Sequence, residues 1–250
     1  MPVTSHVGFG IDIGGSGMKA APVNLSESGQ LVAERFRIPT PHPAKPEAVA
    51  DVVVDLVRHF EWEGPIGIAL PSVVRNGIVH SAANIDESWI DVDAESLFSS
   101  VLKHDVVVMN DADAAGVAEM SFGAGAGRRG VVITLTFGTG IGSALFVDGH
   151  LVPNSELGHL EFRGESFERW AAASARERED LTWRKWARRV SRYLQTVDAL
   201  FSPDVIIVGG GASKSAEKWV PLLEVRPEIV VAEFANTAGI VGAAMSSIRT

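Results

Sequence analysis

One layout occurs twice in this chain, and it constrains the fold more than any other feature. VGFGIDIGGSGMKAAPVN, near the start, and VVITLTFGTGIGSALFVDG, in the middle, both run from an apolar strand through a glycine-rich turn into a second apolar strand. At a fixed offset Asp12 corresponds to Thr136, and Gly14 corresponds to Gly138. We therefore predict an α/β protein with two similar halves, each opened by a β-hairpin with a glycine-rich tip.

Apolar periodicity predicts the remaining elements. The continuous apolar runs IGIALP and VVVMN are typical of buried parallel strands. Strands are expected at 7–13, 18–23 and 31–38, and helices near 47–60, 112–122, 182–201 and 237–248, with a further helix after VIIVGGG.

Composition excludes several classes of protein. The chain has 250 residues, of which 46% are hydrophobic, and this is enough for a substantial core. Its net charge of −9 argues against a general affinity for nucleic acid or anionic membranes. The start, MPVTSHVGFG, lacks the basic and apolar segments of a secretory signal, and no apolar stretch is long enough to cross a bilayer. We expect a cytoplasmic protein.

The glycine loops do not match the common nucleotide-binding motifs. A dinucleotide fingerprint needs its glycines to open a helix, but MKAAPV after the first loop contains a proline and is typical of a strand. The P-loop pattern G-x-x-x-x-G-K-[ST] is absent. Two interpretations stay open. The glycines can simply be those that a tight hairpin turn requires. Alternatively, because glycine has no side chain, the backbone N–H groups of the turns can form a binding site for phosphate.

Four motifs together resemble the ROK family of sugar kinases, within the actin/hexokinase/Hsp70 fold group. DIGGSGMK and LTFGTGIGSAL resemble its two phosphate motifs, MNDADAAGVAE its catalytic segment and ELGH its sugar motif. SAANIDESWI, ELGHLEFRG and ERWAAASARERED most resemble the polyphosphate-dependent glucokinases of that family. The resemblance implies a two-lobed, actin/hexokinase-like (ribonuclease H-like) fold with a central cleft. Residues 1–110 with the final helix 237–250 would form the smaller lobe, and 111–236 the larger.

The implied activity is transfer of a phosphoryl group from polyphosphate, ATP or both to the 6-hydroxyl of glucose, and also of mannose, by a monomer or homodimer with Mg²⁺. Asp111 follows the apolar run 106–109, where open α/β sheets place ligands. From the residues alone it is either catalytic or the N-cap of the next helix. The resemblance implies that it is the general base for the sugar hydroxyl.

The resemblance also implies the sugar ligands. Without it, Glu156 and Glu168 would be read as surface charge and His159 as a core histidine. Typical ROK kinases carry a zinc-binding cysteine cluster after the Glu-x-Gly-His motif, but this chain has no cysteine, so we expect no zinc site and a different role for His159. The implied sugar ligands are Asn110, Asp111, Glu156, His159, Glu168, Ser72 and Asn84.

The implied phosphate and nucleotide ligands lie in the two glycine loops and after VIIV. Asp12 would hold Mg²⁺ through water; the alternative is an aspartate that caps the turn by hydrogen bonding. The glycines after VIIV would let adenosine lie flat on the backbone. The set comprises Asp12, Gly14, Gly15, Ser16, Gly17, Lys19, Thr136, Gly138, Thr139, Gly140, Gly209, Gly210 and Gly211.

The segment 163–192 is basic within an acidic chain. It holds nine Lys or Arg and five Asp or Glu residues. One reading is the solvated face of an amphipathic helix. The other is a track for the tail of polyphosphate, with Lys185, Arg188 and Arg189 as its ligands, because a polyanion needs repeated positive charge along its length.

Other functions compete with this one. The first alternatives are an ATP-only ROK hexokinase and an N-acylhexosamine kinase. The second are non-catalytic proteins, namely an actin-like filament protein or a ROK transcriptional regulator. Regulators of this family carry a DNA-binding domain before the first phosphate motif, and we expect none here because the first strand begins near Val7.

Overall fold

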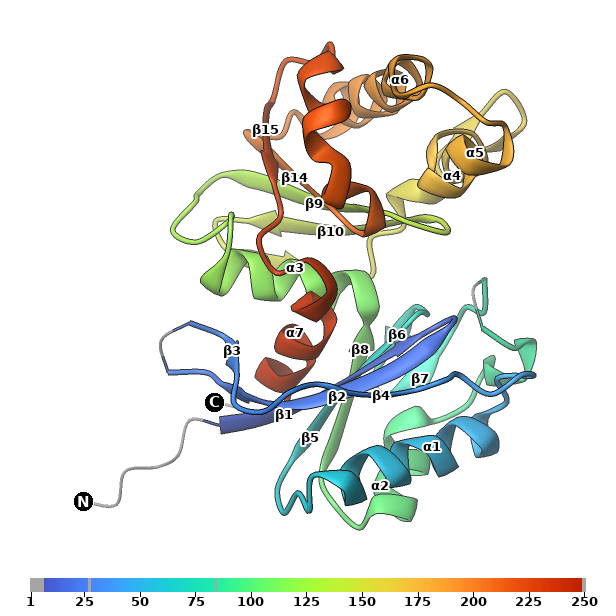
Figure 1. Ribbon diagram of the computed structural model, residues 1–250, viewed down its shortest axis with the longest axis vertical. Helices are drawn as coiled ribbons and strands as arrows, with labels where there is room; N and C mark the ends of the chain where they lie inside the picture. Colours follow the sequence, from blue (N-terminus) through green and yellow to red (C-terminus); the bar gives the residue numbers. More distant parts are fainter. Residues whose placement is uncertain (1–6, 27, 84, 249–250) are drawn as a thin grey trace. The chain divides into compact units, whose positions relative to one another are not determined.

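The computed structural model describes residues 7–26, 28–83 and 85–248. Two compact units are distinguished: residues up to Ala118 together with those from Thr237 onward, and Glu119–Asn236 (Figure 1). The division falls within α3 (Asp111–Phe122), whereas we expected it after residue 110. Among the described residues, no helix is both long and apolar enough to cross a bilayer.

The first unit is a mixed sheet of order β3-β2-β1-β5-β8, with β4 also paired to β2. The β1–β2 hairpin is antiparallel, whereas β5 and β8 run parallel to β1. The strands are β1 (Val7–Gly14), β2 (Gly17–Asn24), β3 (Gln30–Leu31), β4 (Phe36–Ile38), β5 (Ile66–Leu70) and β8 (Val106–Asn110), and the helices beside them are α1 (Pro46–His59), α2 (Ala94–Leu102) and α7 (Ala238–Ser247).

The residues of strand β1 face two different helix layers in alternation. Phe9, Ile11 and Ile13 belong to the apolar core shared with α1 and α2. The other face of the sheet packs on α7, so that the two layers lie on opposite sides (Figure 1). A Cβ on Gly10 would lie 1.9 Å from the carbonyl oxygen of Ile240, so only glycine allows α7 to approach this closely. Asp12 shares the α7 face with Gly10 because side chains alternate along a strand.

One predicted strand is wrong. Residues 31–38 form two short strands, β3 and β4, because the pairing with β2 changes register between them. Val23 pairs with Leu31, but Ala20 pairs with Phe36, which leaves extra residues opposite the middle of β2. Pro22 lies at that point and has no N–H to donate to a continuous ladder.

The second unit repeats the layout of the first. Its sheet has the order β11-β10-β9-β14-β15, with an antiparallel β9–β10 hairpin and with β14 and β15 parallel to β9. The strands are β9 (Val131–Phe137), β10 (Ile141–Val147), β11 (His150–Val152), β14 (Val205–Gly209) and β15 (Glu228–Val231), and the helices are α4 (Phe167–Ala171), α5 (Ala173–Arg178) and α6 (Trp183–Phe201).

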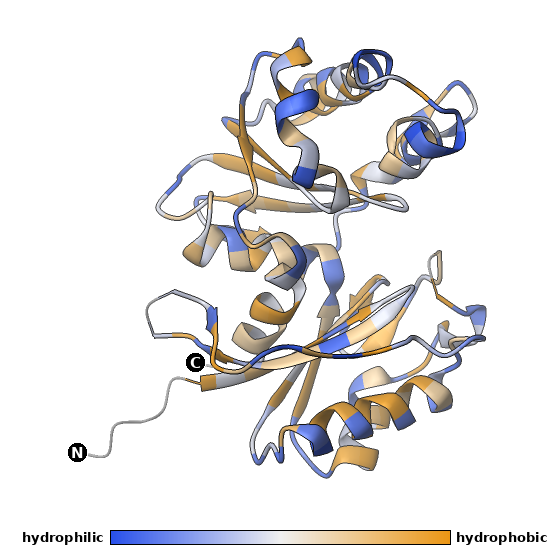
Figure 2. Cartoon of the chain, in the orientation of Figure 1, coloured by the Kyte–Doolittle hydropathy of each residue, from blue (hydrophilic) through white to orange (hydrophobic). Residues whose placement is uncertain are grey.

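The predicted duplication is therefore confirmed. In each unit the hairpin is followed by two parallel strands, and the central strands are mostly hydrophobic (Figure 2). Asp12 pairs with Ala69 of β5, and Thr136 pairs with Gly209 of β14, so the two positions aligned from sequence are equivalent in the sheets.

The helix expected after VIIVGGG is a 3₁₀ helix, η3 (Gly211–Lys218), with a break at Ser215. It contains Gly211, Ser213 and Ser215, and glycine and serine form α-helix less readily than alanine. The remaining short elements are β6 (Val74–Arg75), β7 (Ile78–Val79), β12 (Glu161–Phe162), β13 (Glu165–Ser166), η1 (Glu87–Trp89), η2 (Leu157–His159), η4 (Val220–Leu222) and η5 (Ala235–Thr237).

Candidate active site

The first glycine loop joins β1 to β2, and hydrogen bonds from two side chains to its carbonyl oxygens fix it. Arg37 on β4 donates from Nη2 to the Ser16 oxygen at 2.6 Å, and the Thr40 hydroxyl donates to the Gly14 oxygen at 2.5 Å. A Cβ on Gly15 would meet nothing within 4 Å, so the tip is open to a ligand. Beside it lies a pocket of about 340 Å³, lined by Gly14, Gly15, Thr40 and the following proline-rich loop.

Arg37 and Thr40 were missed by sequence reasoning. Neither stands at a motif spacing, and both reach the loop because β4 pairs with β2 alongside it. A Cβ on Gly17 would lie 2.3 Å from Nε of Arg37, so glycine at this position makes room for the guanidinium rather than for a turn.

Asp12 is partnered by Lys19 across the same hairpin. Asp12 Oδ2 lies 3.2 Å from Lys19 Nζ, and the two side chains are 16% and 22% exposed. The carboxylate also lies against the start of α7, where a Cβ on Gly239 would come within 2.9 Å of Oδ1. Sequence reasoning treated Asp12 as a carboxylate in need of a cation. Lys19 supplies that cation, so the need to neutralise the Asp12 carboxylate does not by itself indicate a metal.

Mg²⁺ fits Asp12 only as a hydrated ion. Among the described residues, no three acidic or histidine side chains gather into a metal-binding group. Mg²⁺ bound to phosphates commonly takes one or two carboxylates and keeps several waters. The part-exposed Asp12 suits that arrangement, with Lys19 beside it as a second positive charge.

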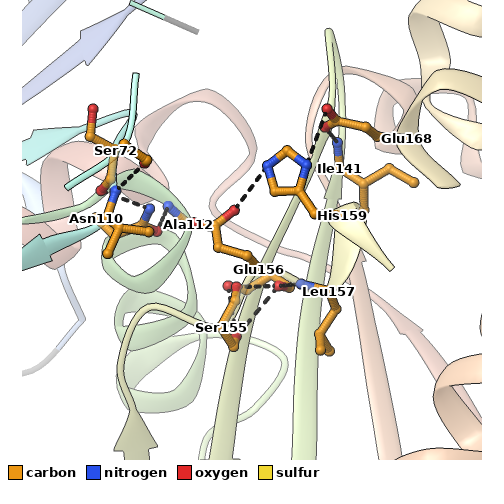
Figure 3. A network of polar contacts seen from close by, with 12 residues as sticks. Ser72, Asn110, Ala112, Ile141, Ser155, Glu156, Leu157, His159 and Glu168 are labelled. Atoms are coloured by element: carbon orange, nitrogen blue, oxygen red, sulfur yellow. Dashed lines mark hydrogen bonds and ion pairs between the residues drawn. The ribbon is translucent and has the colours of Figure 1, made fainter. Parts of the chain in front are cut away.

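Asn110 ends β8 and caps α3. Its Oδ1 accepts from the N–H groups of Ala112 and Asp113 at 2.9 and 3.0 Å, and its Nδ2 donates to the Ser72 oxygen at 3.1 Å (Figure 3). The capping alternative considered for Asp111 thus belongs to Asn110. Asn110 is 6% exposed and its oxygen is occupied, so its second Nδ2 hydrogen is the polar group available to a ligand.

Asp111 and Ser72 lie near this cap. Asp111 is the first residue of α3 and follows directly on a strand end, as predicted. The Ser72 hydroxyl is buried and has no hydrogen-bond partner among the described residues. A buried hydroxyl without a partner costs free energy, which is recovered when a ligand pairs with it. Asn84, the other predicted sugar ligand of this unit, lies outside the described residues.

In the second unit His159 lies between two glutamates (Figure 3). Its Nε2 is 3.6 Å from Glu156 Oε2, and its Nδ1 is 3.6 Å from Glu168 Oε1. The three residues come from different elements: Glu156 precedes η2, His159 ends it and Glu168 lies in α4. Acids that sequence reasoning could have assigned to the surface are therefore gathered around one imidazole.

Burial affects the ionisation of Glu156, one of these three residues. Burial raises the pKa of the Glu156 carboxyl, His159 opposes the rise and Glu168 adds to it. Burial also raises the pKa of Tyr193, and the charge of Glu168 adds to that rise. The Tyr193 hydroxyl is buried beneath the site, without a hydrogen-bond partner among the described residues. Tyr193 is one of the buried residues of α6, and nothing in the sequence distinguishes it from its neighbours in the core.

The second glycine loop, between β9 and β10, is fastened by α4 and α5. The Ser174 N–H donates to the Gly138 oxygen at 3.1 Å, and its hydroxyl donates to the Thr139 oxygen at 2.6 Å. Glu168 accepts from the N–H of Ile141, the residue after the loop, at 3.3 Å. The Glu168 carboxylate thus contacts both His159 and the end of the second glycine loop.

The glycines after β14 lie beside this loop. Gly210 has a φ of +76°, and a Cβ there would lie 2.7 Å from the backbone of Phe137, so this position requires glycine. Gly211 and the loop residues Gly138 and Thr139 line one pocket of about 430 Å³. The structure therefore brings together Thr136–Gly140 and Gly209–Gly211, as the resemblance implied.

The three predicted polyphosphate ligands differ in their contacts. Lys185 and Arg188 are exposed on α6. Arg189 instead makes a two-point ion pair with Glu179, donates to the Trp170 oxygen and lies over the Trp170 ring. Its guanidinium thus links α6 to the segment before it.

Comparisons with known proteins identify the family of this chain. The ROK family model matches residues 8–169. The chain is 50% identical over 246 residues to polyphosphate glucokinase of Mycobacterium tuberculosis, covering 98% of this chain and 92% of that protein. The crystal structure of inorganic polyphosphate/ATP-glucomannokinase from Arthrobacter sp. strain KM matches with a TM-score of 0.92 and 48% identity, covering 96% of this chain and 97% of that one. A ROK glucokinase from Streptomyces griseus shares the fold, with a TM-score of 0.82 at 24% identity. The chain belongs to the ROK family.

Proposed function

We propose that this protein is a glucokinase that transfers a phosphoryl group from inorganic polyphosphate or ATP to the 6-hydroxyl of glucose. The observation that carries the proposal is the 50% identity to a polyphosphate glucokinase over 98% of the chain. The TM-score of 0.92 to a polyphosphate/ATP-glucomannokinase supports the same donors. Neither an ATP-only hexokinase nor a non-catalytic protein is favoured by these matches.

In this proposal Asp111 is the general base. It accepts the proton of the sugar hydroxyl as that oxygen attacks phosphorus. Phosphoryl transfer proceeds through a loose transition state, so positioning and charge neutralisation supply most of the catalysis. The position of Asp111 at the carboxyl end of β8 supports this role, because parallel sheets place ligands at that edge.

The proposed sugar ligands of the second unit are Glu156, His159 and Glu168, and those of the first unit are Asn110 and Ser72. A carboxylate accepts from a hydroxyl, and an imidazole both donates and accepts. The support is that His159 contacts both acids and that Ser72 has a buried hydroxyl in need of a partner. A site of paired polar groups rejects sugars that leave one of them unpaired.

The two glycine loops would hold the donor phosphates through backbone N–H groups. Asp12 would hold Mg²⁺ through water. Bound Mg²⁺ would neutralise phosphate charge, and Lys19 would add a positive charge beside it. The support is the part-exposed Asp12–Lys19 pair at the base of the first loop.

Mannose is a second acceptor in this proposal, because the Arthrobacter protein is a glucomannokinase. A coupled assay with glucose or mannose against ATP or polyphosphate tests all parts together. We expect turnover of glucose with both donors. Absence of turnover with polyphosphate would reduce the protein to an ATP-dependent kinase, and absence with every pair would refute the proposal.

A further inference from the structure

The pocket beside the second glycine loop contains a cation that the proposed reaction has not used. The pocket of about 430 Å³ is bounded by Gly138 and Thr139 on the loop, by Arg176 on α5, by Trp183 at the start of α6 and by Gly211 on η3. It lies wholly within the second unit. A phosphate chain bound at the loop can extend into this space.

Arg176 is placed as an anion ligand. The central carbon of its guanidinium lies 3.7 Å from the centroid of the Trp183 ring. Its Nε is buried and has no hydrogen-bond partner among the described residues, and none of their carboxylates forms an ion pair with it. Leaving this N–H donor buried without a partner is costly, and a phosphate oxygen would remove that cost.

The surroundings of Arg176 are mostly positive. Lys218 Nζ lies 5.9 Å from the same Trp183 ring. Arg184 and Lys185 follow Trp183 in the first turn of α6, whose N-terminal N–H groups also favour an anion. Glu177 is the acid that lines the pocket, and it is exposed to solvent, where its charge is screened.

The stacking of Arg176 on Trp183 favours polyphosphate over ATP as the ligand of this pocket. A guanidinium already covers the indole face that could otherwise stack with an adenine. Beyond its phosphates ATP continues as a neutral nucleoside, whereas polyphosphate continues as a polyanion. Given the proposed function, on which this inference rests, we propose that Arg176, held on Trp183, binds phosphates of an inorganic polyphosphate chain beyond the one transferred and so favours polyphosphate over ATP.

The test compares Arg176→Gln with Arg169→Gln, a matched loss of one exposed arginine from the neighbouring helix α4. Loss of a charge-assisted hydrogen bond corresponds to a change of about tenfold to a hundredfold in affinity. We expect Arg176→Gln to raise the KM for polyphosphate by that factor, with the KM for ATP changed less than about threefold and the KM for glucose unchanged. Arg169→Gln should change none of the three.

Two further measurements test the role of the Arg176 guanidinium. Arg176→Lys keeps the charge without the planar fork, and it should give an intermediate KM for polyphosphate. Calorimetric titration of inorganic tripolyphosphate should show the same order of affinities, without any reaction. If Arg176→Gln weakens both donors equally, or neither, the inference is refuted. If the unmodified protein does not use polyphosphate at all, it is the proposed function that fails.

Discussion

Glu156→Gln is expected to stabilise the protein while weakening its binding of glucose. Burial raises the pKa of Glu156, so the folded chain favours its protonated form. The stability associated with a raised carboxyl pKa is present at acid pH and is lost as the pH rises through that pKa. At pH 8 the folded protein therefore carries an unfavourable charge, which the neutral glutamine removes.

The size of the gain is limited by exposure. The Glu156 side chain is 37% exposed, so solvent screens part of the penalty and the gain is below about 1 kcal/mol. For a chain of this length, that is a rise in Tm of at most about 2–4 °C. The loss in sugar binding is larger, because one charge-assisted hydrogen bond corresponds to about tenfold or more in the KM for glucose.

Thermal unfolding at pH 5 and pH 8, with the glucose KM measured at pH 8, tests this reasoning. The Tm gain should be larger at pH 8 than at pH 5. Glu161→Gln is the matched control, because Glu161 is an exposed glutamate on the nearby β12 and should change neither quantity. A Glu156→Gln protein that is less stable at pH 8, or equally stabilised at both pH values, would refute the argument.

Three other predictions follow from the same structure. Asp111→Asn should lower kcat by at least about 10²-fold with little change in glucose affinity, since the amide keeps the shape but takes no proton; near-full activity would remove Asp111 from the mechanism. Metal analysis should find no stoichiometric zinc, and a chelator should stop the reaction without lowering Tm; a tightly held zinc would show that His159 has other partners. Replacing Lys185 and Arg188 with alanine should raise the KM for long polyphosphate, and added salt should mimic it, whereas Arg189→Ala should lower Tm instead, because it breaks the pair with Glu179. Equal effects on both donors would place the polyphosphate path elsewhere.

Local patterns were sufficient to predict most of the fold. The repeated hairpins, the buried runs at β5 and β8 and the length of α6 follow from apolar periodicity, which acts over a few residues. The division of 31–38 could not be predicted in this way, because it depends on Pro22 in a neighbouring strand.

The sequence drew attention to the candidate residues that stand in motifs and not to those outside them. ELGH and the two glycine loops are short motifs that can be identified from the order of their residues alone. Arg37, Ser174 and Tyr193 reach the site only through strand pairing and helix packing, which no local pattern contains. Arg176 lies in ARERED, where a run of charge is typical of a solvated face, and only the contact with Trp183 distinguishes it.

The packing of α7 has a consequence for the order in which this protein folds as it is made. The helix covers one face of the first sheet, but the ribosome synthesises it only after the whole second unit. Domains generally fold as they emerge, from the N-terminus onward. Here the second unit is continuous in sequence and can close first. The sheet that begins the chain waits, with Gly8, Gly10 and Gly67 uncovered, until its last helix leaves the exit tunnel. A chaperone that binds nascent chains would therefore bind the N-terminal sheet, which is synthesised first.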